Sequence, residues 1–192
     1  VTGPTGTGKT TTLYAGLRYL SDSSQNILTV EDPIEYTLKG IGQTQVNAKT
    51  GISFARGLRE MLRKYPDVVM VGEIRDAETA EIAIQASLTG HLVLSTVHTN
   101  SAIGAITRLR DMGIESFLIS SSLKTVISQR LVRRLCDSCK VTEIIDEKIS
   151  KLFNIDKSTR VFTHKGCNEC NDTGYKGRIA IAECIEIDQT IK

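Results

Sequence analysis

The feature that most constrains the fold is a glycine-rich run at residues 3–10, Gly-Pro-Thr-Gly-Thr-Gly-Lys-Thr, which fits G-x-x-x-x-G-K-[ST]. In this motif, glycines let backbone N–H groups turn toward phosphates, and the helix beginning near the lysine adds its positive end. The motif also needs a strand in front of it. Because Val1 and Thr2 alone precede it, we expect the chain to be a fragment that is poorly stable by itself.

The motif predicts a nucleoside triphosphate site for ATP or GTP. Lys9 can reach the β- and γ-oxygens, and the Thr10 hydroxyl can ligate Mg²⁺. A glycine- and threonine-rich turn that fits by accident is the alternative, and the helical pattern that follows argues against it. The predicted phosphate-binding residues are Gly3, Pro4, Thr5, Gly6, Thr7, Gly8, Lys9, Thr10 and Thr11.

Apolar strand-like runs alternate with helical periods over residues 1–113, the pattern of an α/β domain with a largely parallel sheet. Strands are expected at 27–30, 68–71 and 92–97, and helices at 53–64, 76–90 and 101–113. A longer helix is expected from about Glu115, with its apolar side formed by Ile119, Leu123, Val126, Ile127 and Leu131.

Acidic residues follow two of the expected strands. Glu31 ends the run at 27–30, and Glu73 follows the run at 68–71. In an open parallel sheet, ligands bind beyond the carboxyl ends of the strands. One acid should support the Mg²⁺ shell and the other should orient or deprotonate the attacking water, but local sequence does not say which does which. Acids that simply begin loops are the alternative.

Four cysteines form two C-x-x-C pairs, Cys136/Cys139 and Cys167/Cys170. Such pairs favour a closed tetrahedral Zn²⁺ site with a structural role, since four thiolates leave no open position for catalysis. A redox pair is the alternative, and the doubling of the motif argues against it. The fifth cysteine, Cys184, lies in a strand-like run and is expected to pack in a core.

These patterns predict three parts: an ATPase core at 1–135, a tetracysteine module at 136–177 and a returning strand at 178–192. No run of 18 apolar residues is present, which excludes a membrane span. The 24 basic and 22 acidic side chains nearly cancel. With few aromatic residues and no basic tract among them, the sequence gives no sign of nucleic-acid binding.

Four segments together resemble the signature boxes of the secretion ATPase superfamily, whose members power type II secretion, type IV pili and related machines. The boxes are the phosphate loop and residues 27–36, 71–76 and 89–100. Stretches between the boxes, at 40–47 and 54–59, also match. Residues 105–113 are especially similar to the type II secretion branch. The resemblance covers essentially the whole chain.

The resemblance implies a RecA-like core that works as a hexameric ring, with ATP bound between subunits. It assigns Glu31 as the catalytic carboxylate, Glu73 as the Walker B acid, and His98 as the histidine that senses the γ-phosphate. His91, seven residues earlier, belongs to the same box. An odd spacing puts the two side chains on opposite faces of an unbroken strand, so His91 is expected to be structural.

Arginines at helical spacing form a basic stripe that includes Arg56, Arg59 and Arg63. A solvated helix face is the ordinary explanation. The other is pairing with acids or phosphates across a subunit boundary, for which the planar guanidinium is well suited. Arg59, Arg63 and Arg75 match basic positions of the family and are the candidates.

Taken together, the sequence and the resemblance predict a Mg²⁺-dependent, ATP-hydrolysing motor for pseudopilus assembly in type II secretion. The resemblance implies inner-membrane platform proteins as partners and a cytoplasmic location, peripheral at the inner membrane. A pilus-extension ATPase of the same superfamily, a zinc-bearing nucleic-acid translocase, and a nucleotide-binding scaffold with little turnover remain as alternatives.

Overall fold

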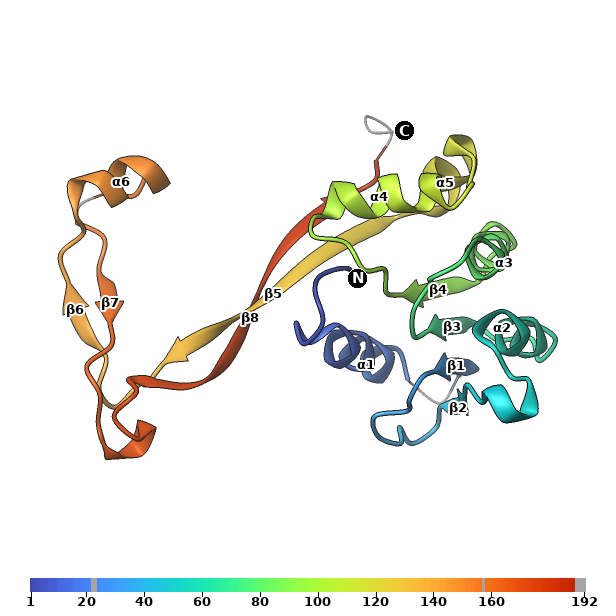
Figure 1. Cartoon of the computed structure of the whole chain (residues 1–192), viewed down its shortest axis with the longest axis horizontal. Helices are drawn as coiled ribbons and strands as arrows, with labels where there is room; N and C mark the ends of the chain where they lie inside the picture. Colours follow the sequence, from blue (N-terminus) through green and yellow to red (C-terminus); the bar gives the residue numbers. More distant parts are fainter. Residues whose placement is uncertain (22–23, 157, 189–192) are drawn as a thin grey trace. The chain divides into compact units, whose positions relative to one another are not determined.

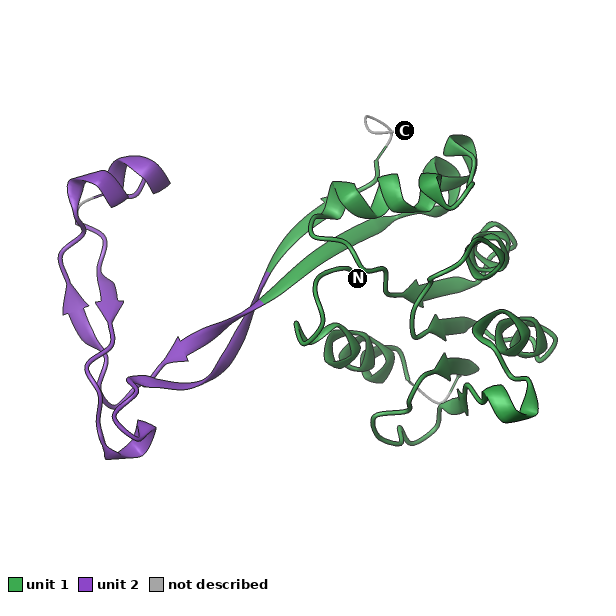
Figure 2. Ribbon diagram, in the orientation of Figure 1, with its two compact units in different colours: residues 1–130, 182–192 green, residues 131–181 purple. Residues whose placement is uncertain are grey.

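The computed structural model describes residues 1–21, 24–156 and 158–188, and the chain divides into two compact units. Unit 1 comprises residues 1–130 and the chain from residue 182 onward, and unit 2 comprises residues 131–181 (Figure 2). Strands β5 (Thr125–Leu135) and β8 (Tyr175–Glu186) form a two-stranded sheet, and each contributes residues to both units.

Unit 1 is built on a parallel four-stranded sheet. Its strands are β1 (Ile27–Glu31), β2 (Gly42–Gln45), β3 (Val68–Val71) and β4 (Leu92–Ser95), in the order β2-β1-β3-β4 (Figure 1). All three strand pairs are parallel. Every residue of β3 is buried, as expected for a central strand covered on both faces. The prediction of an α/β core with a parallel sheet is confirmed.

Helix α1 (Lys9–Leu20) covers one face of this sheet (Figure 1). Its buried residues Tyr14 and Leu17 pack with Ile27, Val68 and Met70 of the sheet. Because side chains alternate along a strand, these residues share one face. The phosphate loop therefore leads directly into the helix that closes this side of the core.

Helices α2 (Phe54–Leu62) and α3 (Ala77–Leu88) cover the opposite face (Figure 1), and η1 (Ala48–Thr50) precedes α2. Val30, Val69 and Val71 point to this side and pack with Leu58 of α2 and Ile84 of α3. The caps follow the sequence signals: the Ser53 side chain accepts from Arg56 N–H, and the Asp76 side chain accepts from Thr79 N–H.

The segment after α4 (Ala102–Asp111) corrects one prediction. The expected long helix from Glu115 ends early, as α5 (Ser116–Ser122), and residues 125–135 form strand β5. The helical spacing of apolar residues was misleading here because the backbone pairs elsewhere. β5 pairs with β8, and Thr2 forms a bridge to it: Thr2 N–H donates to the Ile127 carbonyl at 2.7 Å, and Gln129 N–H donates to the Thr2 carbonyl at 2.9 Å.

Unit 2 contains the antiparallel strands β6 (Val141–Glu143) and β7 (Val161–Thr163), helix α6 (Glu147–Phe153) and η2 (Asn168–Cys170). Among its described residues, 131–156 and 158–181, the buried ones are Cys136, Cys139, Ile145, Cys170 and Gly174. Unit 2 thus has almost no apolar core apart from its cysteines.

Cys184 on β8 is exposed, which contradicts the expectation of core packing. It lies in the two-stranded sheet of β5 and β8, and a strand of such a sheet can leave one face exposed to solvent.

The described helices include none that combines the length and the hydropathy needed to cross a lipid bilayer.

Candidate functional site

The phosphate loop folds tightly at the amino end of α1. Gly8 caps the helix with φ of 83°, a left-handed conformation that favours glycine. The Thr7 hydroxyl donates to the Pro4 carbonyl at 2.9 Å, and Lys9 Nζ donates to the carbonyls of Gly3 and Pro4, each at 2.9 Å. The loop therefore wraps around the lysine, whose ammonium group is buried against its backbone.

Two opposing effects act on the pKa of the Lys9 ammonium group. Burial lowers the pKa of Lys9 from its ordinary value, and the negative charge of Glu73 raises it. That the loop and the acid after β3 bind one nucleotide together stays a prediction.

The Glu73 carboxylate is buried and contacts two other predicted residues. Its Oε2 accepts from Arg75 Nε at 2.5 Å and lies 3.3 Å from Nε2 of His98. Arg75 follows Glu73 by two residues, whereas His98 comes from the segment after the neighbouring strand β4. Glu73, Arg75 and His98 thus form one polar cluster beyond the carboxyl ends of β3 and β4.

Glu31 ends β1, the strand beside β3, and is 1% exposed. Its carboxylate accepts from three neutral donors: the Tyr14 hydroxyl, the Thr29 hydroxyl at 2.6 Å, and Gln43 Nε2 at 3.0 Å. Burial, and then the Glu31 carboxylate, raise the pKa of Tyr14. Because Tyr14 belongs to α1, its hydrogen bond links Glu31 to the helix that follows the phosphate loop.

Tyr14 also organises the segment that follows β1. Its hydroxyl accepts from Glu35 N–H at 3.3 Å, and its ring meets Tyr36 edge to face with centroids 4.7 Å apart. Arg18, one turn further along α1, lies 5.6 Å above the Tyr36 ring. The segment after Glu31 is therefore fastened to α1 by polar and aromatic contacts.

Two of the candidate arginines lie apart from this cluster. Arg59 on α2 forms an exposed ion pair with Glu78 on α3, at 2.6 Å. Arg63 is exposed at the carboxyl end of α2. His91 caps the end of α3, with Nδ1 2.9 Å from the Ala86 carbonyl oxygen, whereas His98 contacts Glu73. The two histidines therefore make separate contacts.

Sequence reasoning missed three polar residues around the loop and Glu31: Tyr14, Gln43 and Gln129. Tyr14 gave a usable signal, since a buried tyrosine on the apolar face of a helix needs a partner for its hydroxyl. Gln129 lay in the segment interpreted as helix. Its side chain is buried and contacts the phosphate loop and α1 through both ends of its amide.

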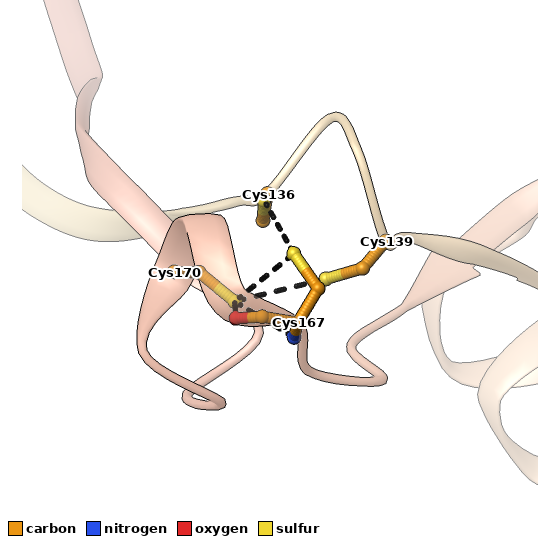
Figure 3. A group of neighbouring side chains, drawn as sticks. All are labelled: Cys136, Cys139, Cys167 and Cys170. Carbon is orange, nitrogen blue, oxygen red and sulfur yellow. Dashed lines mark hydrogen bonds between the residues drawn. The ribbon is translucent and has the colours of Figure 1, made fainter.

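The second candidate site lies in unit 2, where Cys136, Cys139, Cys167 and Cys170 converge (Figure 3). Their four Sγ atoms all lie within 4.8 Å of one another. Three Sγ–Sγ distances are 3.9 Å (Cys136–Cys167), 3.8 Å (Cys139–Cys170) and 3.8 Å (Cys167–Cys170). A tetrahedral site with Zn–S bonds of about 2.3 Å requires sulfur–sulfur separations of about 3.8 Å. The cysteine cluster is therefore compatible with Zn²⁺.

The two thiols of the second cysteine pair have different pKa values. Burial raises the pKa of Cys167 to about 11. Burial acts in the same direction on Cys170, but N–H groups of Cys167 and Gly174 outweigh it and lower the pKa of Cys170 to about 7. A Cβ on Gly174, whose φ is 74°, would lie 2.5 Å from His164 Cβ, so this tight turn requires glycine.

A glycine-rich loop at the start of α1, with acids at the carboxyl ends of adjoining parallel strands, defines a P-loop NTPase core of the RecA-like type. Comparison with known proteins narrows this class. Residues 1–192 match the family described as Type II/IV secretion system protein, and the chain belongs to that family. The resemblance inferred from the signature boxes is confirmed.

Curated relatives are similar along the whole chain. It is 64% identical to type II secretion system protein E of Pseudomonas aeruginosa and 61% identical to type II secretion system ATPase E of Vibrio cholerae. In both cases 100% of this chain is matched, against 39% of the relative. The chain therefore spans about two fifths of the length of these relatives.

Solved structures of related ATPases share the fold. The pilus retraction motor PilT with bound ADP is 34% identical, with a TM-score of 0.72 over 99% of this chain and 47% of PilT. The ATPase DotB of Legionella pneumophila is 29% identical, with a TM-score of 0.68 over 99% of this chain and 45% of DotB.

Proposed function

We propose that the chain is the ATP-hydrolysing part of a motor that powers pseudopilus assembly and protein export in type II secretion. The observation that carries the proposal is the phosphate loop wrapped around Lys9 at the start of α1, together with the contact between the buried Glu73 and His98 after the neighbouring strands β3 and β4. The relatives that are 64% and 61% identical over the whole chain support the secretion system named.

In this proposal, residues Gly3 to Thr11 hold the triphosphate of ATP. Backbone N–H groups of the loop and the amino end of α1 face the phosphate oxygens, and Lys9 turns from the loop carbonyls to the β- and γ-oxygens. The Thr10 hydroxyl would ligate Mg²⁺. The metal, when bound, neutralises charge on the phosphate oxygens.

Glu31 and Glu73 have different roles in the proposed reaction. Glu31 would orient the water that attacks the γ-phosphate, and its three hydrogen-bond donors hold the carboxylate in one orientation. Glu73 would support the Mg²⁺ shell from the neighbouring strand. His98, in contact with Glu73, would respond to the presence of the γ-phosphate.

Assembly into a hexameric ring completes the proposal. Arg75 is already beside Glu73, and the exposed Arg59 and Arg63 are available to meet a neighbouring subunit. The ring would lie in the cytoplasm, peripheral at the inner membrane, and contact platform proteins of the secretion machine. Rearrangement of its subunits on hydrolysis would drive the pseudopilus.

Zn²⁺ on the four cysteines is a further part of the proposal. Unit 2 buries few side chains other than those cysteines, so the metal would supply much of the free energy that folds it. We propose the tetracysteine module at 136–177, between the core at 1–135 and the returning strand at 178–192.

Genetic complementation tests the function. In a bacterium lacking its own copy, the intact protein should restore export of type II substrates, and the Glu73→Gln variant should not. Type IV pili should be unaffected by either change. Restoration of pili, with no effect on export, would favour the pilus-extension alternative.

A salt titration with single-stranded DNA addresses the translocase alternative. The proposed motor should bind DNA weakly, since basic and acidic side chains nearly balance. Tight binding that falls steeply with salt concentration would instead indicate a nucleic-acid translocase.

A further inference from the structure

The side chain of Gln129, on β5, forms hydrogen bonds with the phosphate loop and with α1. It is 4% exposed. Its Nε2 donates to the Thr7 carbonyl at 2.6 Å, and its Oε1 accepts from the Thr12 hydroxyl at 2.8 Å. One buried amide thus joins the loop to the first turn of α1, across more than 115 positions in sequence.

The backbone of Gln129 reinforces this contact. Its N–H donates to the Thr2 carbonyl at 2.9 Å, immediately before the loop begins. Its own carbonyl oxygen lies where a Cβ on Gly3 would come within 2.5 Å of it. The close approach of β5 therefore requires glycine at position 3 and places the Gln129 side chain beneath the loop.

The bond to the Thr7 carbonyl fixes the direction of a peptide unit. A trans peptide is planar, and its C=O and N–H point in opposite directions. When the Thr7 carbonyl points to Gln129, the N–H of Gly8 must point away from β5. Gly8 is the glycine directly before Lys9, so its N–H belongs to the set that the motif directs at phosphate.

We propose that Gln129 is a positioning residue for nucleotide binding, which orients the Thr7–Gly8 peptide so that the Gly8 N–H faces the triphosphate. The inference rests on the proposed function and deepens it. An amide is the side chain that the position needs, because it must donate to a carbonyl and accept from a hydroxyl at once. Neither glutamate nor an apolar side chain of the same length does both.

Three variants of the intact protein test the proposal, with Mg·ADP and Mg·ATP as the probes. Gln129→Met keeps the volume and loses both bonds, and the dissociation constants should rise by about tenfold or more. Gln129→Glu keeps the acceptor for Thr12 but sets a carboxylate against the Thr7 carbonyl, so its affinity should be lower still. Gln85→Met, on the exposed side of α3, is the matched control and should bind like wild type.

A second pair of variants keeps the test valid if the Gln129 variants do not fold. Thr12→Val removes the donor to Oε1 and should weaken nucleotide binding, and Thr12→Ser should restore it. Thr12→Val should add nothing in the Gln129→Met background, since both act through one link. Each affinity is compared with the melting temperature of the same variant, because a merely structural defect would lower stability without this rescue pattern.

The outcomes separate the inference from the function on which it rests. Wild-type protein that binds no nucleotide would refute the proposed function. Wild-type protein that binds, together with Gln129→Met or Thr12→Val variants that bind equally well, would overturn the positioning role alone.

Discussion

Glu73 and His98 meet across two neighbouring strands, with His98 Nε2 3.3 Å from Glu73 Oε2. Side-chain hydrogen bonds also join the ends of β3 and β4 and the residues directly after them. Ser95 Oγ donates to the Val71 carbonyl at 2.8 Å, and Thr96 Oγ1 donates to the Gly72 carbonyl at 2.7 Å. The two segments therefore leave the sheet side by side.

His98→Ala should lower the turnover number for ATP by about 10²-fold, the usual cost of removing one donor aimed at the transition state. Nucleotide affinity should change little, because the phosphate loop is intact. His98→Gln places an amide nitrogen near the position of Nε2 and should recover part of the rate. Steady-state kinetics of the intact protein checks this, and equal turnover for His98→Ala and wild type would remove the histidine from the reaction.

Lys9→Ala should abolish hydrolysis, because no other side chain of the loop carries a positive charge to the β- and γ-oxygens. Release of inorganic phosphate by the intact protein measures the effect. Lys39→Ala, an exposed lysine, is the control and should hydrolyse ATP at the wild-type rate. Retained activity in Lys9→Ala would take the phosphate loop out of the mechanism.

Glu31→Gln should preserve ATP binding and stop turnover. The amide keeps the shape of the carboxylate but no longer attracts the proton of the attacking water. ATP affinity and single-turnover hydrolysis, measured on the same sample, distinguish the two steps. Glu60→Gln, on the exposed side of α2, serves as the control. Loss of ATP binding in Glu31→Gln would show that the role assigned to this acid is wrong.

Tyr14→Phe should lower the free energy of unfolding by about 1.5–3 kcal/mol, the range for a lost hydrogen bond to a buried charge. The hydroxyl that donates to Glu31 and accepts from Glu35 N–H is removed while the ring stays. Tyr19→Phe lies on the same helix with a side chain 90% exposed, and it should leave stability unchanged. Denaturant-induced unfolding measures the free energy of unfolding of both variants and of wild type. Equal values for Tyr14→Phe and wild type would mean that Tyr14 stabilises the fold by packing alone.

Metal analysis of the purified protein should give one zinc per chain. Cys139→Ser should lose the metal, whereas Cys184→Ser, at the exposed fifth cysteine, should retain it. Chelation should open residues 131–181 to proteolysis, because the cysteines provide most of what unit 2 buries. A preparation that is folded and free of zinc would refute the metal site.

Zinc affinity should also fall as the pH falls, since metal binding requires thiolates and releases their protons. The direction follows from both thiols of the second pair: with pKa values of about 11 for Cys167 and about 7 for Cys170 before metal binding, acid returns protons to both. Zinc release followed with a colour-forming chelator between neutral and mildly acidic pH gives the profile. Release that is independent of pH would argue against thiolate ligands.

The sequence by itself determined the features that local chemistry dictates. Gly3, Gly8 and Lys9 could be placed because a phosphate loop needs those residue types at fixed spacing. Glu31 and Glu73 could be placed at one edge because the carboxyl ends of parallel strands lie together. The cysteine pairs were visible for a similar reason, since two residues between cysteines allow both thiolates to reach one metal.

Tertiary structure alone decided the contacts made by residues distant in sequence. Residues 125–135 have apolar spacing compatible with a helix, and pairing of their backbone with β8 and with Thr2 makes them a strand. The bridge to Thr2 brings Gln129 to the phosphate loop, and Cys184 is exposed on the adjoining β8. The physical reason is that backbone hydrogen bonds between distant segments outweigh a periodic pattern, and no local pattern records which segments will meet.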